Sequence, residues 1–221
     1  MDIVIAMILS IGIKGISAIV EIAIQMLITN GVGVSEYGDY TFFVSLIEGA
    51  YFVLFSGSVK LNTFYLSTPS ASLSNFKRKY TVYFVTPIVA VLIAVFAVMK
   101  NPYGILAGVI LYIYYFAFDS SSVFFSRGKQ LPALLGEYLF GRIVLLIGML
   151  LVIRLNATTG LLLLALYGLQ FVTMLLWFAP YKRKLTRGTA EVDVQIKKLA
   201  EFQMSDVANS LISYAPTILQ Y

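Results

Sequence analysis

The chain has 221 residues, of which 59% are hydrophobic and only 12% are charged, and its mean hydropathy is +0.86. About a quarter of the residues in a soluble domain are charged, so this composition excludes an ordinary soluble fold and predicts an integral membrane protein. The sequence contains no Cys and no His, which excludes disulfides and thiolate sites and removes the commonest general base. We therefore expect a protein that is not an enzyme and that uses no cofactor and no metal.

Six segments are long and apolar enough to cross a bilayer, whose core takes about 20 residues of helix. They cover residues 3–29, 41–66, 80–99, 104–126, 133–153 and 159–179. The sequence thus predicts an all-α six-helix transmembrane bundle over residues 1–180. Residues 181–205 are basic and carry apolar residues at helical spacing, which predicts an amphipathic segment on the inner membrane surface, with a solvated linker helix as the open alternative. Residues 206–221 predict the start of a seventh transmembrane helix, so we expect the front part of a larger protein.

The connection between the first two segments, residues 30–40, reads NGVGVSEYGDY. It begins with turn-prone residues, carries two acids and two tyrosines, and contains no Lys or Arg. We expect a polar hairpin here, with its tyrosines anchored at the membrane interface.

The basic residues predict the orientation of the bundle. Of the 16 Lys and Arg residues, 11 fall in the connections after the second, fourth and sixth segments. The connections after the first, third and fifth segments hold only Lys100 and Arg154. By the positive-inside rule the N-terminus is cytoplasmic and residues 30–40 lie on the outer face. The net charge of +5 therefore has a topological explanation, and no nucleic acid is expected as a partner.

Seven charged residues fall inside the predicted spans: Lys14, Lys60, Arg142, Glu21, Glu48, Asp119 and Glu137. A charge at the centre of a bilayer costs about 2.5–3.5 kcal/mol even on the most lenient scale, so these side chains should face protein or water. The third and sixth spans carry none of them, and we expect these two spans to face lipid. Two interpretations remain open: the charges line a cavity, or they pair with one another and only fix helix packing.

The fourth span contains YIYYFAFDSSS, in which Tyr112, Tyr114, Tyr115 and Phe118 precede Asp119 and three serines. Aromatic rings followed by polar groups can stack on a sugar and bond its hydroxyls. Aromatics in a helix more often serve helix packing or lipid contact, and this alternative also stays open.

The spacing Gly33-Val-Ser-Glu-Tyr37-Gly38-Asp-Tyr40 resembles the G-x-x-x-Y-G-x-Y pattern that follows the first helix of polysaccharide (O-antigen type) flippases. These transporters belong to the multidrug/oligosaccharidyl-lipid/polysaccharide exporter superfamily. A long second helix, a short Arg-containing inner loop before a Gly-bearing fifth helix, and Pro216 in the seventh helix are similar as well. The resemblance covers the whole chain, as the N-terminal lobe of such a protein.

The resemblance implies a flippase with two six-helix lobes around a central cavity. Its substrate would be an oligosaccharide repeat unit on undecaprenyl pyrophosphate, moved across a bacterial or archaeal cytoplasmic (inner) membrane for O-antigen, lipopolysaccharide or other surface polysaccharide biosynthesis. Membrane lipids, a polysaccharide polymerase and glycosyltransferases are the implied partners.

The resemblance also implies roles for charged residues within the spans. Lys14, Lys60 and Arg142 would contact the pyrophosphate or acidic sugars of the substrate, and Tyr115 would stack on a sugar. Glu21, Glu48 and Asp119 would couple transport to an ion or pair with the cations. No covalent chemistry is required.

Several other functions fit the same sequence. A drug/cation antiporter or a peptidoglycan lipid-precursor flippase of the same superfamily would share the fold. A membrane-bound glycan-assembly enzyme is disfavoured, because such an enzyme needs an acid/base or nucleophile constellation and the chain has no His, no Cys and no large outer loop. A non-transporting membrane scaffold is the remaining alternative.

Overall fold

The computed structural model describes residues 3–68, 71–186, 190–192, 194 and 200–205. Within these residues it contains six helical spans that are long and apolar enough to cross a membrane, which confirms the predicted all-α transmembrane bundle. The chain is thus a multi-pass membrane protein. The predicted start of a seventh helix, 206–221, lies outside the described residues, as do residues 195–199 of the amphipathic segment.

The first two spans are single helices, α1 (Ile3–Gly31) and α2 (Val34–Tyr65). The third runs through α3 (Ser74–Tyr80), a π-helical turn (Thr81–Val85) and α4 (Thr86–Val98). The fourth is α5 (Pro102–Ser126). The fifth joins α6 (Gln130–Leu134), a second π-helical turn (Leu135–Phe140) and α7 (Gly141–Arg154), and the sixth is α8 (Gly160–Thr186). Two short strands, β1 (Ala71–Ser72) and β2 (Ala190–Glu191), pair in parallel at the end of the bundle that carries the basic connections.

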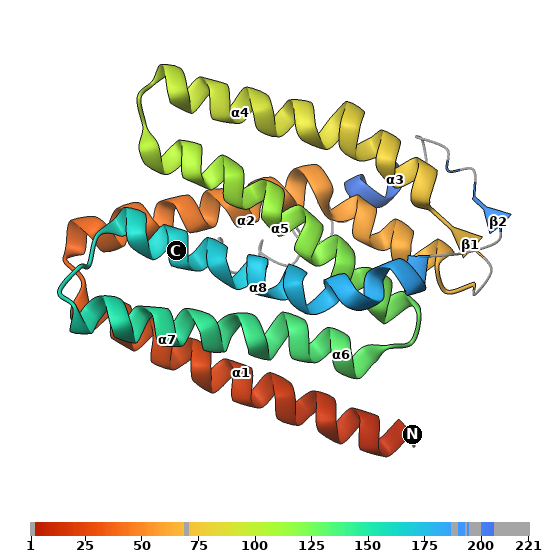
Figure 1. Cartoon of the computed structure of the whole chain (residues 1–221), viewed down its shortest axis with the longest axis horizontal. Coiled ribbons are helices and arrows are strands. Elements are labelled where there is room, and N and C mark those ends of the chain that lie inside the picture. Colours follow the sequence, from red (N-terminus) through yellow and green to blue (C-terminus); the bar gives the residue numbers. More distant parts are fainter. Residues whose placement is uncertain (1–2, 69–70, 187–189, 193, 195–199, 206–221) are drawn as a thin grey trace, which may run out of the picture.

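Helices α5 and α8 form the centre of the bundle (Figure 1). Helix α2 packs against both of them, and α7 packs against α8. The two remaining helices lie at the edges, because α4 packs mainly on α5 and α1 packs mainly on the fifth span. Helices α1 and α2 follow one another in sequence but contact each other little.

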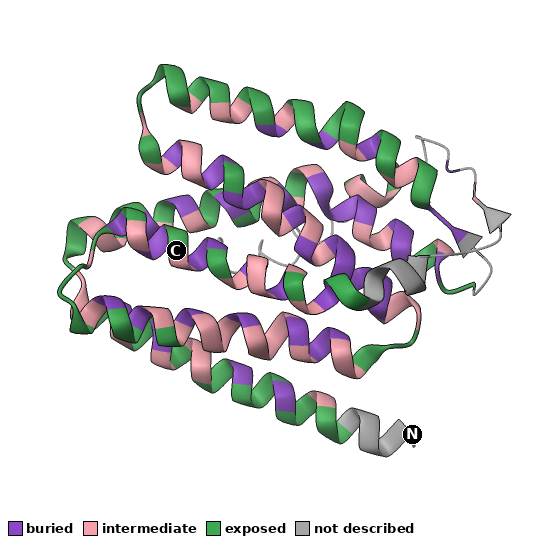
Figure 2. Ribbon diagram, viewed as in Figure 1, coloured by how far each residue is buried: buried purple, intermediate pink, exposed green. Residues whose placement is uncertain are grey.

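The burial of the spans follows this arrangement (Figure 2). In α5, 56% of the most apolar window is buried, against 11% in the third span, which agrees with the predicted lipid-facing position of that span. The same prediction for the sixth span is wrong, since α8 supplies the fully buried side chains of Leu163, Leu164 and Phe178. Lipid and a protein core are both apolar, so the absence of charges does not distinguish a lipid-facing helix from a central one.

The predicted hairpin over residues 30–40 is also wrong. Helix α1 continues to Gly31 and α2 begins at Val34, so the turn itself is very short. Gly33 is the N-cap, in an extended conformation with φ −64° and ψ 149°, and Tyr37 and Tyr40 lie in the first two turns of α2. The residues that resemble the flippase pattern are therefore mostly helical, and the two tyrosines project from a helix rather than a loop.

Candidate functional site

The bundle contains a cavity of about 530 Å³ between α1, α2, α5, α7, α8 and the second π-helical turn. We call it the central cavity. Its wall carries four charged side chains and five tyrosines: Glu21, Glu48, Glu137, Arg142, Tyr37, Tyr40, Tyr114, Tyr138 and Tyr167. If the four charged groups are ionised, the cavity has a formal charge of −2. Within the described residues, no group of three or more acidic, His or Cys side chains could hold a metal ion.

The guanidinium of Arg142 on α7 forms an ion pair with the carboxylate of Glu21 on α1. Both side chains stay partly accessible, with exposed fractions of 30% and 42%. The pair joins the edge helix α1 to the rest of the bundle at about half the depth of both spans. Arg142 thus lies in the cavity as predicted, but its charge is already balanced by an acid of the same chain.

Glu48 is the acid that α2 contributes to the cavity. Its Oε1 accepts a hydrogen bond of 2.8 Å from the hydroxyl of Tyr167 on α8. Among the described residues, Glu48 forms no ion pair, and its side chain is exposed. Glu48 is therefore a carboxylate held in place by one hydrogen bond and accessible from outside the protein.

The second π-helical turn brings Glu137 and Tyr138 to the cavity wall. Glu137 accepts a hydrogen bond of 2.6 Å from the hydroxyl of Ser121 on α5. The ammonium of Lys14 lies 5.6 Å from the centre of the Tyr138 ring, a cation–π distance. Lys14 itself is exposed and does not line the cavity, but its charge also acts electrostatically on the carboxylate of Glu137. Such wider turns recur at functional sites of membrane and soluble helices.

The aromatic side chains of the wall support one another. Tyr114 stacks on Phe118 with ring centres 4.5 Å apart and meets Phe171 at the same distance. Tyr167 meets Tyr40 edge to face at 6.4 Å and Phe171 at 5.1 Å. These contacts fix the rings, and the wall therefore presents tyrosine faces and hydroxyls in a defined arrangement.

The cavity is open along the seam between α1 and α2. Gln25 on α1 and Ser45 and Glu48 on α2 all line it, and all three are exposed. Polar side chains at this depth are unfavourable against lipid, so the seam needs a cover of water or protein.

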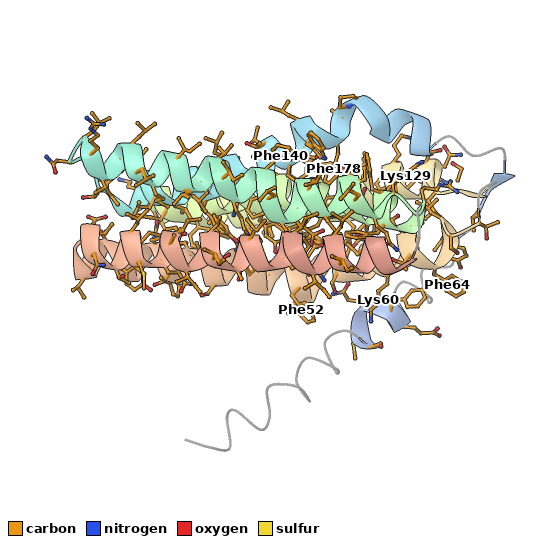
Figure 3. The ribbon with its side chains drawn as sticks, turned by 90° about the horizontal axis from the view of Figure 1, so that it is seen from below. Phe52, Lys60, Phe64, Lys129, Phe140 and Phe178 are labelled. Carbon is orange, nitrogen blue, oxygen red and sulfur yellow. The ribbon has the colours of Figure 1, made fainter. Side chains whose placement is uncertain are left out.

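Lys60 and Tyr115 are two further predicted site residues that lie outside the cavity. Lys60 is half-buried near the basic end of α2, on the side that faces residues 200–205 (Figure 3), and does not line the cavity. Tyr115 is 1% exposed and packs against Phe55 and Tyr80, with its hydroxyl 3.5 Å from that of Thr81. On α5, Tyr114 and Phe118 are the aromatics that line the cavity, and Tyr115 does not.

Asp119 belongs to a second polar cluster, which we call the Asp119 network: Asn62, Lys77, Asp119 and Ser122. The ammonium of Lys77 lies 2.6 Å from Asp119 Oδ1, and the amide of Asn62 donates to the same oxygen at 2.9 Å. The Asn62 amide also donates to Ser122 Oγ at 2.5 Å. Asp119 therefore forms an ion pair, and its partner Lys77 lies on α3, at the start of the third span.

The face of α2 that lines the cavity can be recognised in the sequence from the spacing of its polar residues. Tyr37, Thr41, Ser45 and Glu48 line the cavity, and their spacing of four, four and three residues places them on one side of a helix. A polar stripe at this spacing within an apolar span predicts a wet face. On α8 the signal is weaker, because Tyr167 and Gln170 are surrounded by leucines and aromatics.

Comparison of the chain with family models, with curated proteins and with solved structures finds no match in any of the three.

Proposed function

We propose that this chain forms one lobe of a flippase that moves lipid-linked oligosaccharide units across a bacterial or archaeal cytoplasmic membrane. The observation that carries the proposal is the central cavity, which is polar, open at one seam and placed inside an otherwise apolar bundle. The seven-residue spacing from Gly33 to Tyr40 supports it, because two of its tyrosines line that cavity. The lipid tail would stay in the bilayer while the head group crosses in water.

The chemistry of the wall suits a sugar. Tyrosine rings offer apolar faces for the C–H surface of a pyranose, and their hydroxyls donate and accept hydrogen bonds. Glu48 and Glu137 add carboxylates, which are strong acceptors for sugar hydroxyls or amino groups. Three glutamates against one arginine disfavour an acidic sugar here, so we assign the cavity to neutral or amine-bearing units.

This assignment changes the roles that the resemblance implies. Arg142 is a positioning group that holds Glu21 and α1, rather than a free cation for pyrophosphate. Lys14 and Lys60 do not line the cavity, and the pyrophosphate would stay near the basic connections at the membrane surface. Glu48 is the residue best placed for substrate contact or ion coupling.

The second candidate is a cation antiporter of the same superfamily. The excess of carboxylates in the central cavity favours it, because an organic cation or a proton would be attracted there. The two candidate functions involve different transported substrates, and one set of variants distinguishes between them.

In the complete protein, Glu48→Gln should lower surface polysaccharide about tenfold or more while the amount of inserted protein stays unchanged, because a neutral amide cannot replace a charge-assisted acceptor. Arg142→Gln should lower it too, since it frees α1. The double variant Glu21→Gln/Arg142→Gln leaves no charge unpaired and controls for misfolding. Arg154→Gln changes an exposed cation outside the cavity and should have no effect.

The measurement is surface polysaccharide together with sensitivity to toxic organic cations. Lost polysaccharide with unchanged sensitivity supports the flippase. Unchanged polysaccharide with raised sensitivity in the Glu48→Gln cells identifies the antiporter. If neither readout changes, the central cavity is not a transport site.

A further inference from the structure

A second hollow lies at the end of the bundle that carries the basic connections. It has a volume of about 330 Å³ and runs between the start of the third span and the inner parts of α2 and α5. We call it the inner groove. None of its lining residues lines the central cavity, and the transport function proposed above does not use it.

The polar groups of the inner groove are gathered on α3 and its continuation. Lys77 and Arg78 supply two cations, Ser74 and Thr81 supply hydroxyls, and Asp119 is the only acid. The ion pair of Asp119 with Lys77 cancels that acid, which leaves Arg78 as the net charge of the groove. Arg78 is exposed, and the described residues provide it with no ion pair.

The rest of the wall is apolar. It consists of Leu66, Leu73, Val82, Tyr115 and Phe116. Val82 has an exposed fraction of 53%, and the neighbouring Tyr83 is exposed to 78%, so this side of the third span faces the bilayer. A ligand of the groove must therefore match a cation and hydroxyls at one end and hydrocarbon along the other side.

We propose that the inner groove binds an anionic phospholipid of the surrounding membrane. Its phosphate lies against Arg78 and the hydroxyls of Ser74 and Thr81, and the upper part of one acyl chain lies along Val82 and Phe116. The juxtaposition of guanidinium and apolar wall selects an amphiphile over a free anion, and the net positive charge selects an anionic head group over a zwitterionic one. A bound lipid of this kind would secure the start of the third span.

The test uses the purified full chain, stripped of lipid, with phosphatidylglycerol and phosphatidylcholine of identical acyl chains as probes. Native mass spectrometry of detergent-solubilised protein gives the bound fraction of each lipid. Arg78→Gln should weaken phosphatidylglycerol binding about fivefold, as expected for one basic residue near a membrane surface. Lys79→Gln removes the same charge one position away, outside the groove, and should leave binding within about twofold.

A second pair of variants tests the apolar wall. Val82→Trp fills the groove and should abolish retention of phosphatidylglycerol, whereas Tyr83→Trp, on the adjacent exposed position, should not. Equal loss for Arg78→Gln and Lys79→Gln would show general surface attraction and overturn the proposal. Equal binding of phosphatidylcholine, displacement of the lipid by millimolar glycerol phosphate, or full binding by Val82→Trp would overturn it as well.

Discussion

The central cavity and the Asp119 network both place acidic side chains inside transmembrane helices. They differ in how exposed these carboxylates are and in how many hydrogen-bond or ion-pair partners they have. In the network, Asp119 is 3% exposed and its Oδ1 receives both an ammonium and an amide. In the cavity, Glu48 is exposed and receives a single tyrosine hydroxyl, while Glu21 has an exposed fraction of 42%. A charged residue in a span is therefore not by itself a functional site, and its exposure separates structural from available groups.

The difference also predicts how strongly a substitution in each region lowers the stability of the protein. A closed network of charges contributes to stability only while every member is present, since removal of one leaves another buried and unpaired. An open cavity lets water replace a lost partner. We therefore expect loss of a charged group from the network to destabilise the protein, and substitutions in the cavity to change its activity.

The largest expected effect is the presence or absence of thiol labelling at a given position. It tests the predicted orientation, which places the Asp119 network at the cytoplasmic end. The chain has no Cys, so a single introduced thiol has no background. With a thiol reagent that cannot cross membranes, Asn156→Cys should be labelled in intact cells and Lys129→Cys only after permeabilisation. Both positions are exposed connections at opposite ends of the bundle. The reverse pattern would place the N-terminus and the network on the outer side.

Within the network, Asp119→Ala should lower the free energy of unfolding by about 3–5 kcal/mol, because the Lys77 ammonium would remain largely buried without its partner. Detergent-based denaturation monitored by circular dichroism measures the change. The double variant Lys77→Met/Asp119→Leu removes both charges and should recover much of the loss. A single variant within about 1 kcal/mol of the parent would show that the network is dispensable.

At the end of the bundle opposite the basic connections, the carboxylate of Glu36 on α2 accepts from the backbone N–H of Gly160 and from the hydroxyl of Tyr103. A Cβ at Gly160 would lie 2.8 Å from Glu36 Oε2, so Gly160→Ala should cost about 1–3 kcal/mol of stability. At Gly38, in the flippase-like pattern, a Cβ meets nothing within 4 Å, so Gly38→Ala should stabilise α2 by about 0.5–1 kcal/mol. Equal effects in thermal unfolding would contradict this contrast.

The smallest loss of stability is expected at the cavity wall. Tyr167→Phe removes the hydroxyl that donates to Glu48 and should cost only about 0.5–1.5 kcal/mol of stability, because water can replace the donor in an open cavity. Transport activity should fall even though the loss of stability is small, because Glu48 loses its fixed position. A loss of stability as large as that of Asp119→Ala would show that the cavity is closed and structural.

The sequence predicted the six spans because a bilayer imposes a length and an apolar composition on each helix. It also pointed to Glu21, Glu48 and Arg142, since charges in a span are costly enough to be noticed. It could not predict the pairing of Arg142 with Glu21 or of Asp119 with Lys77, which depends on how helices rotate and pack. The same holds for α8, whose central position leaves no mark in its charge-free sequence, and for Tyr37 and Tyr40, whose surroundings resembled a loop.

Residues 200–205 illustrate a contact that no local pattern reveals. The Gln203 amide accepts from the backbone N–H of Gly57 at 2.6 Å and donates to the carbonyls of Phe52 and Val53 at 2.8 and 2.5 Å. Gly57 makes room for it, because a Cβ there would lie 2.7 Å from Gln203 Oε1. For a glutamine in a basic amphipathic segment the sequence predicts a solvent-exposed side chain. Only the fold places it against the backbone of α2.

The most direct test of the central claim compares water access to the two polar regions by single-cysteine labelling. Ser45→Cys in the central cavity and Ser122→Cys in the Asp119 network are similar changes of a serine within a transmembrane helix. With a small water-soluble methanethiosulfonate reagent, the account predicts rapid labelling of Ser45→Cys and no labelling of Ser122→Cys in the folded protein. Equal rates at the two positions, or an unreactive Ser45→Cys, would contradict it.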